Sequence, residues 1–557
     1  IIGQNTGTNS PRMMTELVHA RKRGAPIVAV NPMPERALIR FTEPQDAIKM
    51  ATFGSTPIAS EFCHVRIGGD AAFLKGVMKT LFEMDAAAEA AGEAPVLDHA
   101  FIAEHTHGFA ELKADIEATQ WPDIVAMSGI AEEQIRHVAG IYARSNATII
   151  CYGMGVTQHQ QGARVIHQIA NLLMLRGNFG KKGAGICPVR GHSNVQGDRT
   201  VGIDEKPAPA YLDRLQAVFG FNPPRAHGHH VVESVQAMID GTAKVFIGMG
   251  GNFIHAIPDT PVAYEAMSRL ELTVGIATKL NRGHLVHGRD ALILPVIARS
   301  EIDHQKTGPQ FVTIEDAMAN VTSSRGVLHP ASADLRSEVE IVCRMARAAM
   351  PDSPIAWESF IEDYDRIRDL IAQVYPDLYH DFNTRIRNKK GFALPVPPRE
   401  RKWNTPTGRA NFLLIEGLDE DTPIGGPDIL RLSTIRSHDQ YNTTIYTNND
   451  RYRGVYNTRT VLFMNAEDMR ARGLEEGALA DIETISADGT ERRVTGFMVV
   501  PYPMPRGSIA GYYPELNPLL PLSHFDEISG TPAAKSIPVR VMAQTAPVAA
   551  RPEPQPA

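Results

Sequence analysis

Apolar and polar positions follow two rhythms along the first half of the chain. Short β-branched runs end at Gly or Pro, and the segments between them repeat apolar residues at helical spacing. In the first helical segment Ser10 is expected to be the N-cap, Pro11 lies in the first turn and Gly24 ends it. This alternation predicts parallel sheets covered by helices on both faces. Strands are expected at 1–3, 25–32, 147–155, 244–252 and 271–281, and helices at 10–24, 71–83, 131–145, 161–177, 231–241 and 260–270.

The pattern changes twice in the second half of the chain. After residue 325 it weakens, with helical spacing over 336–350 and 355–375, and a Pro-rich linker is expected at 393–408. From about residue 428, short β-rich runs separated by turn residues predict a small barrel. These runs are 429–438, 459–465, 478–485, 492–500, 507–513 and 537–542.

Composition limits the classes of protein that fit. The 557 residues correspond to about three to four domains, and the net charge of −7 does not suggest a nucleic-acid surface. No apolar run reaches the roughly 18 residues of a membrane helix. Cys63, Cys151, Cys187 and Cys343 are far apart and form no CxxC pair. This argues against a disulfide scaffold, a zinc ribbon or an iron–sulfur site built from this chain alone, and a cytoplasmic location is the default expectation.

The chain opens on Ile1-Ile2-Gly3, with no Met and no signal peptide. These residues look like the end of a buried strand that runs straight into a turn. Because a domain rarely begins on the last residues of a core strand, we expect a fragment with further residues upstream.

Three predicted strands run directly into polar or Gly-rich turns, at residues 3–10, 153–158 and 248–254. Ligands of open parallel sheets bind beyond the carboxyl ends of the strands, where helix N-termini and glycines admit phosphate groups. An ordinary strand-to-helix turn explains any single one of them. Three in one chain favour a large phosphorylated ligand, or two copies of one.

Residues 186–198 read ICPVRGHSNVQGD, too polar and too aperiodic for a core segment, and predict a loop. Arg190 offers a fixed cation with a fork of donors, and His192 can donate, accept or carry a proton. Asn194 and Gln196 can hydrogen-bond the edge of a heterocycle. The alternative is a surface loop closed by its own side chains.

Other polar groups are weaker candidates. The segments 298–308, 433–446 and 511–519 follow apolar runs and suit either a site or a buried ion network. His227, His229 and His230 are expected in a solvated loop rather than at a metal. His159 and His167 are expected on helix faces, and Cys187 is expected to be a buried thiol. The 186–198 loop therefore remains the first candidate, followed by the segments 298–308, 433–446 and 511–519.

Residues 152–198 resemble, nearly end to end, a segment of the molybdopterin oxidoreductases that carry bis(molybdopterin guanine dinucleotide). The matching motifs are GMGVTQ at 153–158 and GAGICPVRGHSNVQG at 183–197, and the similarity is greatest to formate-dehydrogenase-like α subunits. The resemblance extends from residue 1 to about 545. It implies an enzyme with molybdenum or tungsten that oxidises or reduces a small anionic substrate by two electrons. Formate dehydrogenases commonly carry Gln at the position of His192, so a subgroup with another substrate is expected.

The same resemblance implies roles for individual residues. Arg190 would orient the anion, and His192 would donate a hydrogen bond or take a proton. The metal's protein ligand, and the cysteines of a 4Fe-4S cluster in members that have one, are expected upstream of residue 1. The implied cofactor-binding residues are Gly3, Gln4, Asn5, Asn31, Gly153, Gly155, Ser193, Asn194, Gly248, Gly250, Asn252, Thr278, Lys279, Arg436, Ser437, His438, Gln440, Asn517 and Lys535.

The expected fold class is α/β and multi-domain, with two doubly wound parallel-sheet dinucleotide-binding domains and a C-terminal β-barrel cap. The expected partners are a small-molecule substrate and an electron carrier or redox subunit. The alternative is a catalytically inactive electron-transfer scaffold of the same fold, which the polar loop at 186–198 argues against. The expected division is 1–190 and 191–325 for the α/β domains, 326–425 for a helical or irregular connection, 426–545 for the barrel and 546–557 for a disordered tail.

Overall fold

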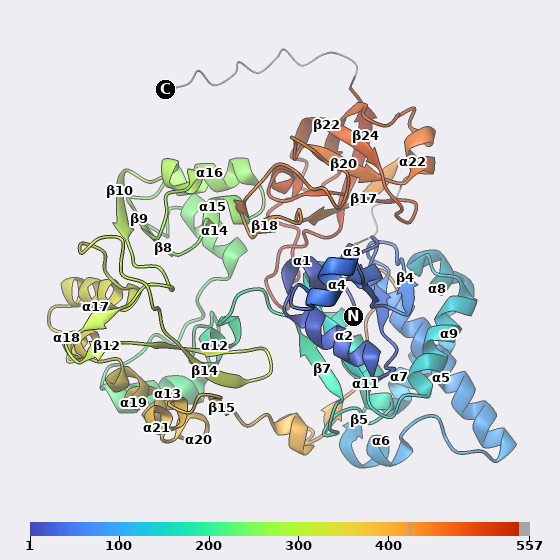
Figure 1. Cartoon of the computed structure of the whole chain (residues 1–557), viewed down its shortest axis with the longest axis horizontal. Coiled ribbons are helices and arrows are strands. Elements are labelled where there is room, and N and C mark those ends of the chain that lie inside the picture. The colour runs from blue at the N-terminus through green and yellow to red at the C-terminus, as the bar shows by residue number, and fades with distance from the viewer. Residues whose placement is uncertain (423–425, 427, 545–557) are drawn as a thin grey trace. The chain divides into compact units, whose positions relative to one another are not determined.

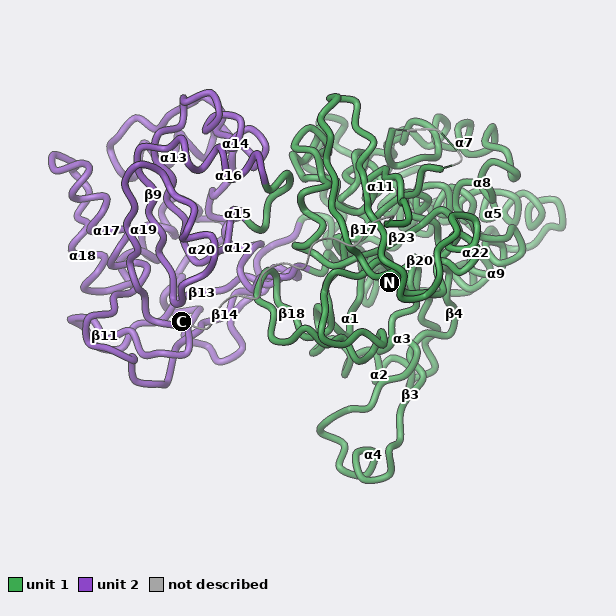
Figure 2. The backbone as a smooth tube through the Cα atoms, turned by 90° about the horizontal axis from the view of Figure 1, so that it is seen from above, with its two compact units in different colours: residues 1–189, 255–260, 397–557 green, residues 190–254, 261–396 purple. Residues whose placement is uncertain are grey.

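The computed structural model describes residues 1–422, 426 and 428–544 (Figure 1). The chain forms two compact units (Figure 2). Unit 1 contains residues 1–189, 255–260 and 397–557, and unit 2 contains residues 190–254 and 261–396. The predicted tail at 546–557 lies outside the described residues. Among the helices that are described, none combines the length and the apolar character needed to cross a membrane.

A parallel sheet forms the centre of the first part of unit 1. Strand β1 (Val28–Val30) pairs with β4 (Glu61–Cys63), and β6 (Ile149–Tyr152) pairs with β7 (Gly185–Pro188). Ile2 joins the two pairs, because it forms parallel bridges to both Val30 and Tyr152. All these strands run in one direction, so the turns that follow Ile2, β1 and β6 lie at the same edge.

Long helices of unit 1 bury the apolar residues of this sheet. They are α5 (Asp70–Ala91), α9 (Glu132–Ala143) and α11 (Gly162–Leu175). In α11, Val165, Ile169 and Leu172 recur at helical spacing and lie in the core. The expected N-cap at Ser10 is wrong: Ser10 closes α1 (Thr6–Asn9), and α2 (Met13–Lys22) starts without a side-chain cap. Asn5 is instead the N-cap of the preceding helix α1, and Ser10 is the C-cap of that helix.

The C-terminal part of unit 1 is a closed six-stranded barrel with strand order β17-β23-β20-β22-β21-β24. It confirms the predicted mixed α/β class with a barrel, and a strand forms in each of the six β-rich runs. The inward apolar side chains of these strands are buried, since every second residue faces the interior. The strands are β17 (Ile429–Ile435), β20 (Val461–Met464), β21 (Leu479–Thr484), β22 (Arg493–Pro501), β23 (Ser508–Tyr512) and β24 (Ile537–Ala543).

Unit 2 contains a second parallel sheet, of order β8-β9-β10. Its strands are β8 (Val245–Met249), β9 (Leu272–Ala277) and β10 (Asp290–Pro295). An antiparallel sheet adds β13 (Val312–Glu315), β14 (Asn320–Ser324) and β15 (Phe392–Ala393). The helices are α12 (Val195–Thr200), α13 (Pro209–Phe219), α14 (Val231–Ile239), α16 (Thr260–Ser268), α17 (Glu338–Ala349), α18 (Trp357–Glu362), α19 (Asp365–Val374), α20 (Pro376–Tyr379) and α21 (Phe382–Ile386).

Shorter elements complete the chain. In unit 1 they are α3 (Arg36–Ile39), β2 (Arg40–Phe41), α4 (Ala47–Thr52), β3 (Thr56–Pro57), α6 (His99–His105), β5 (Thr106–His107), α7 (Phe109–Ala118), α8 (Trp121–Ser128), α10 (Met154–Thr157), η2 (Pro397–Glu400), β16 (Ala410–Asn411), β18 (Gln440–Tyr441), β19 (Thr444–Ile445), α22 (Ala466–Ala471) and η3 (Asn517–Leu519). The others are α15 (Phe253–Ala256), η1 (Arg282–Leu285), β11 (His304–Gln305) and β12 (Gly308–Pro309).

Candidate cofactor and substrate site

Two strand-end turns of unit 1 lie backbone against backbone. The Gly155 N–H donates to the Gly3 carbonyl (2.9 Å), and Gly3 has a φ of +58°. A Cβ on Gly3 would lie 2.7 Å from the Val156 nitrogen, and a Cβ on Gly155 would lie 2.5 Å from the Gly3 Cα. A Cβ on Gly153 would lie 2.1 Å from the side-chain oxygen of Gln4. Because no side chain fits between them, these glycines allow the ends of two parallel strands to meet.

Polar side chains surround the first of these turns. Gln4 and Asn31 are buried, and Asn31 Nδ2 donates to the Gln4 carbonyl (3.3 Å). The Asn5 side chain accepts from the Thr8 N–H (3.2 Å) and caps α1. The hydroxyl oxygens of Thr6 and Thr8 are buried and have no hydrogen-bond partner within the described part of the chain. Since a buried polar atom without a partner costs free energy, these hydroxyls fit a ligand that would accept from them.

Two basic residues of the C-terminal barrel region contact the segments after these turns, Arg436 through its guanidinium and Lys535 through its backbone. Arg436 Nη1 donates to the Asn9 side chain (3.4 Å), and the Lys535 N–H donates to the Gln158 carbonyl (3.0 Å). Lys535 Nζ also donates to the Thr434 carbonyl. Burial, together with the nearby Arg436 charge, lowers the pKa of Lys535 to about 7. Neither cation forms an ion pair with a described carboxylate, so together they suit a multiply charged anion such as a pyrophosphate.

Two further predicted residues of the barrel region are engaged by the protein itself. The Gln440 side-chain oxygen accepts from the Ser437 N–H (3.0 Å) and from Arg459 Nη2 (3.0 Å). Arg459 Nη1 also donates to the Ser437 hydroxyl (2.7 Å), and its Nε pairs with Glu515 (2.5 Å). Ser437 and Gln440 are both buried. These contacts form an internal network that shapes the loop after β17.

His438 and Asn517 are held in similar ways. His438 Nδ1 lies 2.7 Å from a carboxylate oxygen of Asp450. The buried Asn517 amide donates to the carbonyls of His255 (2.8 Å) and Ile257 (3.1 Å). Asn517 thus fastens the 255–260 segment to η3. Their predicted contacts with a cofactor stay a prediction.

The predicted residues of unit 2 gather at the carboxyl ends of β8 and β9. Gly248 lies on β8, and Gly250 follows it with a φ of +76° and donates its N–H to the backbone of β9 (2.8 Å). The Asn252 side-chain oxygen is buried with no hydrogen-bond partner among the described residues. Thr278 and Lys279 follow β9 and are exposed. This edge therefore presents an orphan amide oxygen, a hydroxyl and a cation.

The predicted loop at 186–198 is shorter than expected. Its first residues belong to β7, and its last residues form α12, with the Asn194 side chain bonded to Asp198 (2.8 Å). The prediction of a loop over the whole run is wrong, because one turn of helix starts directly after Asn194. Between these elements Arg190 and His192 are both exposed. Arg190 forms no ion pair with any carboxylate that the structure describes; burial raises the pKa of Glu315, and the Arg190 charge opposes that rise only in part.

Two contacts fix this loop to the rest of unit 2. Arg299 Nη1 donates to the Ser193 hydroxyl (2.7 Å), and the Asn194 side chain accepts from the Glu315 N–H (2.9 Å). Burial raises the pKa of the Glu315 carboxyl below the loop. Arg299, from the segment 298–308, thus supports the loop from within unit 2.

The remainder of that segment is an internal network. Asp303 accepts from Tyr364 and from Gln305 Nε2 (2.8 Å). Lys306 pairs with Glu362 (2.6 Å). His230, from the histidine-rich run, caps α14 through the Glu233 N–H (3.4 Å).

Two sequence predictions about single residues are wrong. His159 is not on a helix face: it lies between α10 and α11, is 1% exposed, and contacts Asp421 across 2.8 Å. No local pattern marks it, because its partner lies 262 positions away. Cys187 is half-buried rather than buried, and it lies on β7 in register with Cys151.

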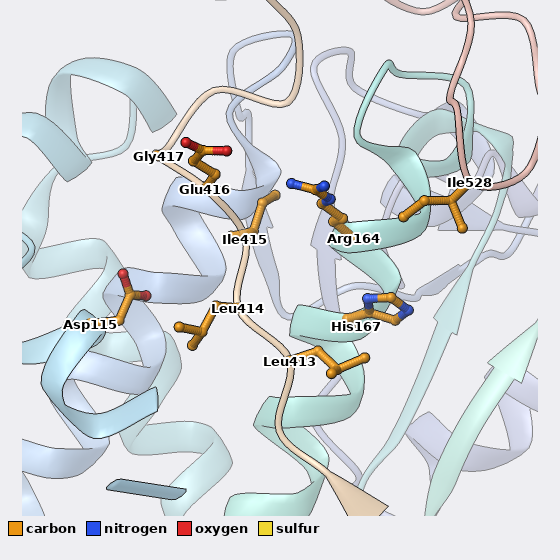
Figure 3. A pocket seen from close by; sticks show the side chains of 9 residues that line it. All are labelled: Asp115, Arg164, His167, Leu413, Leu414, Ile415, Glu416, Gly417 and Ile528. Carbon is orange, nitrogen blue, oxygen red and sulfur yellow. The ribbon is translucent and has the colours of Figure 1, made fainter. Parts of the chain in front are cut away.

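A separate cavity of about 560 Å³ lies in unit 1 between α11 and the segment 413–417 (Figure 3). Arg164 and His167 project from α11 beside Ile528, and Glu416 lies beyond Ile415. None of the catalytic or cofactor-binding residues predicted from sequence lines this cavity. The strand-end turns therefore remain the candidate site.

Comparisons with known proteins assign the family. Residues 430–538, which include most of the barrel, match the molydopterin dinucleotide binding domain. Protein YdeP of Escherichia coli K12 is 49% identical over 542 residues, which cover 97% of this chain and 71% of that protein. An uncharacterised oxidoreductase of Mycobacterium tuberculosis is 47% identical over 547 residues, with coverage of 97% and 69%. Formate dehydrogenase H of Escherichia coli is 24% identical over 508 residues, with coverage of 86% and 64%.

The fold agrees with this assignment. Acetylene hydratase from Pelobacter acetylenicus superposes with a TM-score of 0.63 at 15% identity, over 98% of this chain and 77% of that one. The chain belongs to the molybdopterin oxidoreductase family, and it is a molybdopterin-dependent oxidoreductase with distant similarity to formate dehydrogenases. The family and the enzyme class predicted from the sequence are confirmed.

Proposed function

We propose that the protein uses bis(molybdopterin guanine dinucleotide) with molybdenum or tungsten to oxidise or reduce a small anionic substrate by two electrons. The observation that carries this proposal is the exposed cation Arg190, which forms no ion pair with a carboxylate of the described chain and lies two residues from His192. A guanidinium in that state suits a carboxylate or oxyanion, which it can bind through two parallel hydrogen bonds.

Each unit by itself contains residues that fit a phosphorylated dinucleotide. In unit 1, Arg436 and Lys535 would neutralise one pyrophosphate, and the orphan hydroxyls of Thr6 and Thr8 would donate to it. In unit 2, Lys279, Thr278 and Asn252 would serve the second dinucleotide. When bound, the cofactor supplies a metal centre that exchanges two electrons with the substrate.

The chain's own contribution is to bind and orient. Arg190 would hold the anion, while His192 would donate a hydrogen bond to it or take a proton from it. Arg299 and Asn194 keep the loop in place from below, through Ser193 and the Glu315 backbone. Electrons would then leave to a carrier or redox subunit.

Arg190→Ala tests the substrate role. In the full-length protein, purified without oxygen, turnover of formate and other small anions should fall at least about tenfold, the usual worth of a charge-assisted contact. Arg190→Lys should recover only part of it, because an ammonium lacks the planar fork. Arg199→Ala is the matched control: Arg199 lies on α12 and already pairs with Glu205 (2.6 Å). Unchanged kinetics in Arg190→Ala would remove this role.

A further inference from the structure

His159 lies directly under the Gly153–Gly155 turn. Its Nε2 is 2.9 Å from the Gly155 carbonyl oxygen, and its Nδ1 is 2.8 Å from an oxygen of Asp421. Both partners can only accept a hydrogen bond when Asp421 is ionised. A neutral imidazole can donate from one nitrogen only, so two acceptors at hydrogen-bond distance require both nitrogens to carry hydrogen. The geometry therefore describes an imidazolium.

Charged groups from several elements surround this imidazolium. Glu420 lies 3.5 Å from Nδ1 through its Oε2, and its Oε1 accepts from the Ala71 N–H (2.7 Å) at the start of α5. Asp70, also on α5, is buried beside Glu420. From β17, Arg431 forms a double contact with Asp419. His524, before β24, is bonded to the Ser536 carbonyl (2.9 Å), and burial lowers its pKa, so it is neutral here.

The cluster contains more acids than bases. Asp70, Asp419, Glu420 and Asp421 face the two cations Arg431 and His159. One oxygen of Asp70 and one of Glu420 have no hydrogen-bond partner in the described part of the chain. Burial raises the pKa of Asp70, and it raises the pKa of Glu420 to about 7. Burial therefore favours the protonated form of Asp70 and leaves Glu420 only partly ionised at neutral pH, while the charge of His159 balances Asp421.

The same histidine joins three separate parts of unit 1. The Gly155 N–H donates to the Gly3 carbonyl (2.9 Å) while the Gly155 carbonyl accepts from His159. Residues 420 and 421 are joined to the residues before α11: the Gln160 N–H donates to the Asp421 carboxylate (2.9 Å) and the Gln161 N–H to the Glu420 backbone carbonyl (2.8 Å). Gly155 is therefore hydrogen-bonded both to Gly3 and to His159.

We propose that His159 is a positioning residue: as an imidazolium at neutral pH it holds the Gly153–Gly155 turn against Gly3 and against the 419–421 segment that leads into the barrel. This role of His159 rests on the proposed function in one respect only, namely that the turn binds the cofactor. The His159 imidazole is buried and contacts protein groups, so we assign it no contact with substrate. Its effect on the enzyme would pass through the backbone of the turn.

The pH dependence follows from the surroundings. Burial by itself lowers the pKa of His159, but the charges of Asp421 and Glu420 outweigh it and raise the pKa to about 9. Burial also opposes ionisation of Asp421, yet the His159 charge lowers the pKa of Asp421 to about 2. A base with a raised folded pKa stabilises the fold fully below its unfolded pKa of 6.5, and this contribution is lost as pH rises towards 9. The turn should therefore be held through neutral pH and released above it.

The first test is an NMR titration of the full chain with ¹³C-labelled histidine. His159→Gln removes one imidazole signal and so assigns it. That signal should remain in the imidazolium form through pH 8 and titrate near pH 9. In Asp421→Asn the same signal should titrate at least about one pH unit lower, because a main charge partner is gone. Titration of the wild-type signal below pH 7 would overturn the proposal.

The second test asks whether the turn itself moves. Hydrogen exchange of the amides of residues 153–156 should speed up at least about tenfold in His159→Gln at pH 7, after correction for intrinsic rates. His137→Gln is the matched control, since it removes an exposed histidine that pairs with Glu61 at 3.0 Å on the surface. Turn amides that keep wild-type exchange in a folded His159→Gln protein would contradict the positioning role. If His159→Gln does not fold, Asp421→Asn serves both measurements.

Metal and pterin content of the same preparations separates this inference from the proposed function. A signal that titrates near pH 9 in protein that never contains cofactor would support the role of His159 and refute the cofactor. Cofactor present with a His159 that titrates below pH 7 would do the reverse.

Discussion

Lys535→Met should stabilise the cofactor-free protein at low pH while weakening its hold on the cofactor. The pKa of Lys535 is lowered from 10.5 to about 7, mainly by burial. At about 1.4 kcal/mol per pKa unit, keeping this ammonium charged costs about 5 kcal/mol at pH 6. Methionine removes that cost but also the hydrogen bond to the Thr434 carbonyl, worth about 1.5–3 kcal/mol for a charged donor. The net stabilisation at pH 6 is therefore about 2–3 kcal/mol.

The sign of the effect depends on pH in a defined way. The folded state releases the Lys535 proton near pH 7, whereas the unfolded chain keeps it up to about pH 10.5. Between these two pH values, the free energy of unfolding of the wild type therefore rises with pH. The advantage of Lys535→Met should shrink from pH 6 upward and disappear near pH 10, where only the lost hydrogen bond remains.

Thermal unfolding of cofactor-free protein from pH 6 to pH 10 measures this, with Lys402→Met as the control because Lys402 is an exposed partner of Glu400 (2.6 Å). The control should change little at any pH. In parallel, the molybdenum or tungsten content of Lys535→Met purified from cofactor-producing cells should fall. A variant that is less stable than wild type at pH 6, and that keeps its cofactor, would refute the reasoning.

Three further outcomes are expected. Gly155→Ala should lower the free energy of unfolding by about 1–3 kcal/mol, because its Cβ would lie 2.5 Å from the Gly3 Cα. In the control Gly140→Ala, on α9, the new Cβ would meet only an arginine side chain at 3.3 Å, so this variant should be neutral or stabilising. Chemical denaturation of both variants compares them. Arg299→Ala frees the Ser193 hydroxyl and should raise KM about fivefold with a smaller change in kcat, and an unchanged KM would show that the loop needs no such support. Elemental mass spectrometry of the full-length protein should find about one molybdenum or tungsten per chain, and about four irons with it if a 4Fe-4S cluster is present; absence of both metals from cofactor-producing cells would favour the scaffold alternative.

Local pattern was sufficient for most of the elements. The six barrel strands and the strands β1, β6, β8 and β9 are short apolar runs bounded by turn residues, and that signal is contained within each run, whereas β4, β7 and β10 were not predicted. Helix ends were less predictable. Ser10 and the start of α12 depend on which of several neighbouring polar groups caps which turn, and a single sequence does not decide that competition.

The chemistry of single residues divides in the same way. The sequence by itself indicated that Gly3, Gly153 and Gly155 end strands and that Arg190 and His192 share a polar segment, because these features lie within a few positions of each other. Only the tertiary structure showed that Gly155 packs on Gly3, that Arg436 and Lys535 reach Asn9 and Gln158, and that His159 pairs with Asp421. These partners are separated by more than a hundred residues, and the fields and hydrogen bonds that set their charge arise only when the sheet and the barrel bury them together.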